Sequence, residues 1–145
     1  MRPLGLVALL ACAGLGLQPG CGLRSPEGVA DKFVDYYFVE IDQGRALPLT
    51  AGLAHDMIER ELRDVASIRK QMGYMPADAR PDVYYKRTGA RDEGERTVFT
   101  YDITIKHRED VMRKVAQVAV HKQGAEWKVI FYKVADGEAP QRPPG

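Results

Sequence analysis

The sequence predicts an α+β domain in which two or three N-terminal helices pack on a curved antiparallel sheet of about four strands. Apolar residues recur at helical spacing in the first half of the chain and alternate with polar residues in the second half. Short polar turns separate the strand-like segments, which favours antiparallel hairpins. The predicted domain covers residues 26–135, after a signal segment (1–21) and a tether (22–25). A tail (136–145), rich in proline and glycine, is expected to be disordered.

The first predicted helix begins at Ser25-Pro26-Glu27, where serine can cap free backbone N–H groups and proline suits the first helical position. Gly44 is expected to end it. Arg45 to Thr50 is expected to form one short helical turn. The apolar face of the first helix consists of Val29, Phe33, Val34, Tyr37, Phe38 and Ile41.

A long helix is predicted from about Leu53 to Met72. Its outer face carries oppositely charged pairs four residues apart, which is typical of a solvated surface. Gly73 to Pro76 ends this helix and begins a loop. The predicted inner stripe consists of Ala54, Met57, Ile58, Leu62, Val65, Ile68 and Met72.

Four strands are predicted after the helices. Val83 to Thr88 is rich in tyrosine and valine, and Gly89 to Gly94 is expected to form a polar turn. Thr97 to His107 alternates clearly: Phe99, Tyr101, Ile103 and Ile105 share one face, and Thr100, Asp102, Thr104 and Lys106 share the other. Val111 to Lys122 also fits a helix, but its valines favour a strand, with a bulge expected near Val115. Trp127 to Val134 is its expected hairpin partner.

The N-terminal segment has the pattern of a secretory signal. Residues 3–20 carry no charge and follow Arg2. The apolar stretch from Leu4 to Leu17 is shorter than the roughly 20 residues of a membrane-spanning helix. The alternative, a buried helix of the domain, is less consistent with a run that has no polar face.

Both cysteines, Cys12 and Cys21, lie in this segment, so the predicted domain has neither an internal disulfide nor a cysteine-based metal site. The residues Leu17-Gln18-Pro19-Gly20-Cys21 resemble the lipobox of bacterial lipoproteins, although Gln18 and Pro19 depart from its usual residues. The resemblance implies that Cys21 carries lipid and anchors the protein in a membrane of the bacterial envelope, facing the periplasm. Cys12 is the alternative lipidation site, and a secreted protein with an unmodified thiol is the alternative fate.

Composition excludes several functions. Lysine and arginine number 21 against 20 aspartates and glutamates, and this balance argues against nucleic-acid binding. The chain has no glycine-rich phosphate loop, and neither of its two serines lies in a nucleophile elbow. His55 precedes Glu59 by four residues, but two ligands make a poor metal site. No cofactor and no metal are therefore predicted.

The order of elements resembles the nuclear transport factor two-like, or cystatin-like, superfamily over residues 26–134. The resemblance includes an aromatic-rich first helix, the short helix Ala46-Leu47-Pro48-Leu49-Thr50, and a final hairpin from Val118 to Val129. It implies a cone-like sheet wrapped on the long helix, often with an apolar pocket and often in a dimer. The superfamily includes isomerases, dehydratases and many non-catalytic domains, so the fold alone does not give the function.

The leading hypothesis is a non-catalytic, lipid-anchored envelope protein that binds a partner protein or a small apolar ligand. The alternative is a small isomerase or dehydratase that uses Tyr36 or Tyr37 with Asp102, which lies mid-strand. The polar pattern around Asp102 instead favours a solvated side chain, or one paired with Lys106 or a neighbouring strand. A third possibility is a secreted structural homodimer whose sheets pack together.

Overall fold

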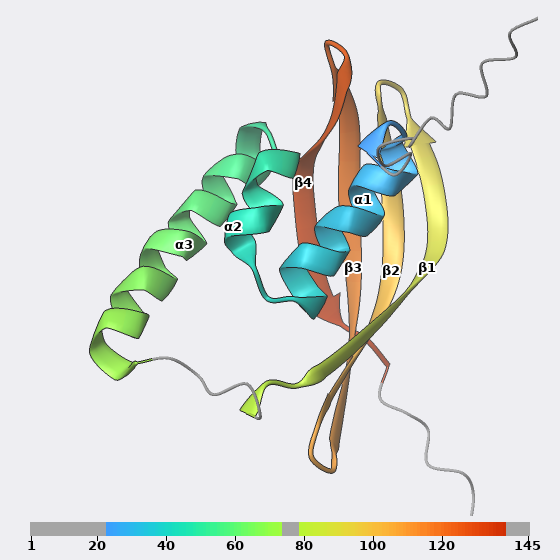
Figure 1. The fold of residues 1–145 in the computed structure, drawn as a ribbon. Helices are drawn as coiled ribbons and strands as arrows, with labels where there is room; N and C mark the ends of the chain where they lie inside the picture. Colours follow the sequence, from blue (N-terminus) through green and yellow to red (C-terminus); the bar gives the residue numbers. More distant parts are fainter. Residues whose placement is uncertain (1–22, 74–78, 139–145) are drawn as a thin grey trace, which may run out of the picture.

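The computed structural model describes residues 23–73 and 79–138. The chain forms a layer of helices followed by one sheet of four antiparallel strands in the order β1-β2-β3-β4 (Figure 1). This confirms the predicted α+β class. The helical elements are α1 (Pro26–Val34), the π-helical turn η2 (Asp35–Val39), α2 (Gln43–Ala46), the 3-10 turn η3 (Leu47–Leu49) and α3 (Gly52–Met72). The strands are β1 (Asp82–Glu93), β2 (Arg96–His107), β3 (Asp110–Gln123) and β4 (Glu126–Asp136).

The first helix begins as predicted but ends early. The Ser25 hydroxyl accepts a hydrogen bond of 3.0 Å from the backbone N–H of Gly28, and Pro26 occupies the first helical position. The helix widens into the π turn η2, and Ile41 then adopts a φ of 53°. The prediction that Gly44 ends the helix is therefore wrong: Gly44 lies inside α2, whose N-cap is Asp42.

The strands are longer than predicted. The expected turn at Gly89 to Gly94 is wrong, because β1 continues to Glu93 through a register shift between Arg87 and Gly89. A glycine in a strand can mark such a bulge rather than a turn. The bulge expected near Val115 is also wrong. The irregularity in the pairing of β3 with β4 lies instead at Ala119 and Val120. Their partners in β4, Phe131 and Val129, are separated by one extra residue.

The core lies between the helix layer and one face of the sheet. Phe99, Tyr101 and Ile103 of β2 are buried there, as the alternation predicts, against Phe33 of α1 and Ile58 of α3. Figure 1 shows the helices on a single side of the sheet. The other side of the sheet, here called the open face, is covered by no helix or strand among residues 23–73 and 79–138.

Only the first half of α3 packs as predicted. Ala54 and Ile58 are buried, and Met57 and Leu62 pack partly against the core. Farther along, Ile68 is 55% exposed and Met72 is 83% exposed. Figure 1 shows the reason: the C-terminal half of α3 extends beyond the sheet. The apolar stripe of α3 therefore continues along the helix beyond the end of the sheet that buries its first half.

Candidate functional site

The residues predicted to carry the lipid, Cys21 and the alternative Cys12, lie outside the described residues. The described chain begins at Leu23, two positions after Cys21 and just before α1. Within residues 23–73 and 79–138, no helix is long and apolar enough to cross a membrane.

The structure separates the two tyrosines from Asp102. Tyr37 belongs to η2, and its hydroxyl lies 2.8 Å from Glu61 Oε2 on α3. Tyr36 lies beside cations, with the Lys32 ammonium 4.6 Å and the Arg45 guanidinium 4.1 Å from its ring centroid. Asp102 is exposed on the open face, opposite Lys86 of β1 in the strand register. The candidate tyrosine and aspartate therefore do not meet in one pocket.

Glu61 of α3 links η2 and the strand β4. Its carboxylate accepts hydrogen bonds from the hydroxyls of Tyr37 in η2 and Tyr132 in β4, the latter at 2.8 Å. The rings of these two tyrosines lie 5.1 Å apart, and both pack on Phe33. Burial, and then the bond to Glu61, raises the pKa of both phenols above the usual value, so they remain neutral donors.

Asp31 makes a second link of this kind. It accepts a hydrogen bond of 2.7 Å from the hydroxyl of Tyr101, whose side chain is fully buried in the core. Arg87 of β1 lies 3.3 Å from the same carboxylate. Burial, and then the bond to Asp31, raises the pKa of the Tyr101 phenol. Both carboxylates thus tie helices to strands.

The roles of Glu61 and Asp31 were not predicted from the sequence. Glu61 lies three residues after Ile58 and four before Val65, so it is an acid within the predicted inner stripe. An acid on an apolar face is a signal of a buried polar partner. The partner could not be identified from the sequence, because the two tyrosines that bond Glu61 lie 24 and 71 residues away along the chain.

The histidines form no metal centre. His55 Nε2 lies 3.5 Å from Glu59, and its Nδ1 lies 3.2 Å from the Thr50 hydroxyl. His121 lies 3.5 Å from Glu95. Among the described residues, no group of three histidines, cysteines or acids is placed to hold a metal ion.

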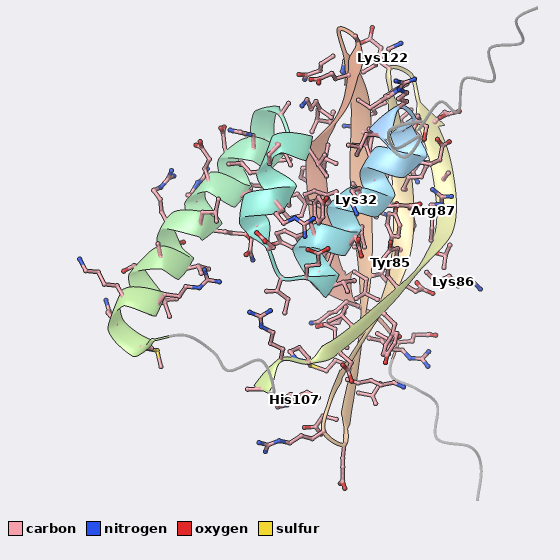
Figure 2. All side chains as sticks on the ribbon, in the orientation of Figure 1. Lys32, Tyr85, Lys86, Arg87, His107 and Lys122 are labelled. Carbon is pink, nitrogen blue, oxygen red and sulfur yellow. The ribbon has the colours of Figure 1, made fainter. Side chains whose placement is uncertain are left out.

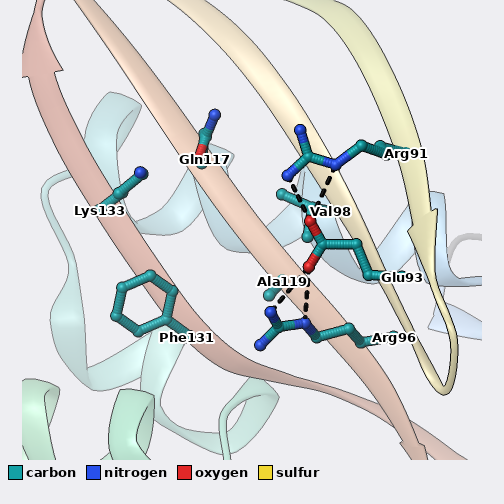
Figure 3. Close-up of a pocket in the computed structure, with 8 residues that line it drawn as sticks. All are labelled: Arg91, Glu93, Arg96, Val98, Gln117, Ala119, Phe131 and Lys133. Atoms are coloured by element: carbon teal, nitrogen blue, oxygen red, sulfur yellow. Dashed lines mark hydrogen bonds and ion pairs between the residues drawn. The ribbon is translucent and has the colours of Figure 1, made fainter.

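The open face carries a shallow depression of about 300 Å³, here called the sheet hollow (Figure 3). Its apolar floor is formed by Val98 and Ala119, which are 8% and 2% exposed, with Phe131 beside them. All four strands contribute to it. The full lining is Arg91, Glu93, Arg96, Val98, Gln117, Ala119, Phe131 and Lys133.

The charges of the sheet hollow are arranged around one carboxylate. Glu93 lies 2.9 Å from Arg91 Nε through one oxygen and 2.7 Å from Arg96 Nη2 through the other. These two guanidinium groups hold the pKa of Glu93 below its usual value. Lys133, on the far side of the floor, has no ion pair with any residue in 23–73 or 79–138. The sheet hollow therefore combines apolar contact with surplus positive charge.

A second depression of about 630 Å³ lies at the end of α3, here called the α3 groove. It is lined mainly by apolar side chains, among them Val65, Ile68 and Met72 of α3 and Ile41 between η2 and α2. This groove results from the exposed second half of the α3 stripe.

Comparison with known proteins yields a likeness of fold only. No family model matches the sequence, and no curated protein matches it. A similar solved structure is that of a SEC-C motif containing protein from Rhodopseudomonas palustris, with a TM-score of 0.51 and 13% identity, covering 78% of this chain and 80% of that one. Another is a designed protein titled Rd1NTF2_05, with a TM-score of 0.46 and 12% identity, covering 72% of this chain and 91% of that one. At 13% identity, the likeness to the SEC-C motif containing protein concerns the fold alone.

Proposed function

We propose that this chain is a non-catalytic, lipid-anchored protein of the bacterial cell envelope, built on a nuclear transport factor two-like domain, that binds a partner protein on the periplasmic side. The observation that carries the proposal is that aromatic side chains fill the space between the helices and the sheet. Between the helices and the sheet, Phe33, Tyr37 and Tyr132 pack in mutual ring contact. The tyrosine hydroxyls are engaged by Glu61, so no described acid and hydroxyl are free there to act on a substrate.

The anchor is supported by the sequence before the domain. An uncharged segment follows Arg2 and closes on Cys21. Because an extended chain covers at most about 3.6 Å per residue, a lipid on Cys21 would hold α1 within roughly 20 Å of the bilayer. A diacylated N-terminus binds firmly, since each buried methylene contributes about 0.8 kcal/mol.

Mass spectrometry of the full chain expressed in a bacterial host tests the anchor. We expect cleavage before Cys21 with lipid on its thiol, and a Cys21→Ser variant that is neither lipidated nor sedimented with membranes. Cys12→Ser is the matched control and should keep both properties. Lipid on Cys12, or a cleaved chain with an unmodified Cys21, contradicts the assignment.

The enzymatic alternative, in which Tyr36 or Tyr37 acts with Asp102, makes a different prediction about Asp102. If the chain is a binding protein, Asp102→Asn leaves its association with partners unchanged, because Asp102 is exposed on the open face and lies outside the sheet hollow. In-cell cross-linking of the wild-type chain and this variant, compared by the pattern of adducts, is the measurement. If Asp102→Asn gives the same growth phenotype as deletion of the gene while its adduct pattern is unchanged, catalysis is supported instead.

A small apolar ligand is the second candidate, and the α3 groove favours it. Ile68 and Met72 are exposed there beside Val65, forming the apolar wall of a depression of about 630 Å³. Fluorescence of N-phenyl-1-naphthylamine with the purified full chain is the test. Binding that Ile68→Glu abolishes, with the Leu53→Glu control unaffected, supports this candidate, and the absence of saturable binding excludes it for this probe.

A further inference from the structure

The charge of the open face is uneven although the chain as a whole is nearly neutral. Strand alternation places three acids, Asp82, Glu93 and Asp102, on this face together with more numerous cations. Figure 2 shows Lys86 directed away from the helix layer, whereas neighbouring Arg87 bonds Asp31 of α1. The open-face cations are Lys86, Arg91, Arg96, Lys106, Arg113 and Lys133.

The surplus is concentrated at the sheet hollow. Three cations line it together with the single carboxylate Glu93: Arg91 and Arg96 contact Glu93, and Lys133 lies across the floor (Figure 3). Glu93 neutralises only one of them, although it contacts both arginines. Beyond the hollow, Lys86 and Arg113 lie near Asp102 and Glu138, and Lys114 forms an ion pair with Asp136, so the charges there are balanced. Positive potential is therefore localised above the apolar floor, where a bound anion would be partly shielded from water.

The floor adds a second requirement. Val98, Ala119 and Phe131 offer apolar contact beside the charged groups, while Gln117 supplies an amide at the edge. A ligand that matches this surface has an apolar side chain next to one or more carboxylates. A simple anion would leave the floor uncovered, and an apolar molecule would leave the cations without a partner.

The two ends of this chain do not have that chemistry, because residues 1–22 and 139–145 contain no aspartate or glutamate. Residues 74–78 contain one acid, Asp78, against the three cations of the sheet hollow. A second copy placed with its open face on this one would set Arg91, Arg96 and Lys133 of the two copies against each other. Like charges facing across an interface cost several kcal/mol. The occupant is therefore a different molecule.

We propose that the sheet hollow is the docking site for an acidic, apolar-containing segment of the partner protein, with its apolar side chain on Val98, Ala119 and Phe131 and its carboxylates on Arg91, Arg96 and Lys133. This inference rests on the proposed function and specifies where and by what chemistry the partner binds. The charges steer the encounter, and the floor supplies the contact area. The association is consequently sensitive to salt.

Site-specific cross-linking of the full chain in its bacterial host tests the proposal. p-Benzoylphenylalanine replaces Phe131, a substitution close in shape, and mass spectrometry identifies the peptide in each adduct. We expect a peptide of another protein with a net negative charge. Combining the probe with Arg91→Glu and Lys133→Glu should lower the adduct yield about tenfold, the effect of 1.4 kcal/mol. The matched control carries Arg60→Glu and Lys70→Glu on α3 and should retain the yield.

Each other outcome overturns the proposal. An adduct with this chain itself identifies the open face as a homodimer interface, and an adduct with lipid identifies it as a membrane contact. A neutral or basic peptide, a yield unaffected by the charge reversals, or no adduct also contradicts the acidic docking site. A probe at Ile68 distinguishes failure of the docking site from failure of the proposed function. A protein adduct at residue 68 with none at residue 131 means that the chain binds a partner through the α3 groove and not through the sheet hollow.

Discussion

At the scale of single residues, the helix and sheet layers are joined by two carboxylates. Glu61 accepts hydrogen bonds from Tyr37 and Tyr132, and Asp31 accepts one from Tyr101. Hydrogen bonds to charged groups contribute more than neutral ones, about 1.5–3 kcal/mol against 0.5–1.5 kcal/mol. The two links therefore fix the helices on the sheet more specifically than apolar contact alone, which is non-directional.

Glu61→Ala is expected to destabilise the fold by about 1–3 kcal/mol, because it leaves two tyrosine hydroxyls without their acceptor. Glu61→Gln retains an amide oxygen that can accept one of these bonds and should lose less. Urea unfolding followed by circular dichroism measures both. Equal stability of Glu61→Ala and the wild type would mean that this cluster contributes nothing to the fold.

The tyrosines also predict a pH dependence. Burial raises the pKa of Tyr37, Tyr101 and Tyr132 above that of an unfolded tyrosine, about 10. The unfolded chain then releases more protons than the folded one at alkaline pH. Their contribution to stability is fully present below pH 10 and declines as the pH rises above about 10. Phenolate absorbance should show these tyrosines ionising together with the loss of circular dichroism; ionisation of all seven before unfolding contradicts their burial.

At this scale the sequence predicts the role of the tyrosines but not their partners. Their place in apolar patterns indicates core aromatics with a polar edge, and the structure agrees. Glu61 was not identified, because its partners come from η2 and β4 and meet only after the helix layer packs on the sheet. Asp102 shows the reverse case: its alternation with Tyr101 and Ile103 is local, and it correctly predicts an exposed face.

At the scale of elements, α3 shows how an amphipathic pattern differs from burial. The stripe runs the length of the helix, but the sheet supports only its first half. Periodicity reports which face of a helix is apolar and not how far its neighbour extends. The exposed part, with Ile68 and Met72, then lines the α3 groove.

Two matched truncations test this division of α3. Ile58→Ala removes a fully buried side chain and should cost about 2–5 kcal/mol. Ile68→Ala removes one that is 55% exposed and should cost about 0.5 kcal/mol or less. The difference in the free energy of unfolding is the measurement. A large cost at Ile68 would show that its surface is covered in solution.

The strands were predicted in number and order, but their irregularities were not. Alternation located β2 almost to the residue, from Thr97 to His107. The same reasoning took Gly89 as part of a turn, because glycine and charged residues are typical of turns. A bulge and a turn share this composition, and only pairing with β2 distinguishes them.

At the scale of the whole molecule, one sheet face holds the core and the other is open. β2 and β3 occupy the centre of the sheet and contribute many of the buried side chains. The C-terminal half of α3 lies outside this arrangement. Stability is therefore expected to be uneven across the chain.

Amide hydrogen exchange should reveal that distribution. Amides of Phe99 to Ile103 in β2 are expected to exchange only through global unfolding, while those near Ile68 to Met72 exchange through local opening. Mass spectrometry of the full chain, with α1 as an internal reference, provides the measurement. Protection of the end of α3 as strong as that of β2 would show that α3 has a partner that the described residues do not include.

The two edges of the sheet are protected in different ways. Along β4, Thr50 forms a bridge to Val129, and the Ala51 N–H donates to the Val129 carbonyl at 2.9 Å. Along β1, the irregularity after Arg87 interrupts the regular row of backbone groups. An interrupted or covered border is a poor template for another chain. Both borders are therefore expected to resist strand-to-strand polymerisation into fibrils when copies of the chain are concentrated.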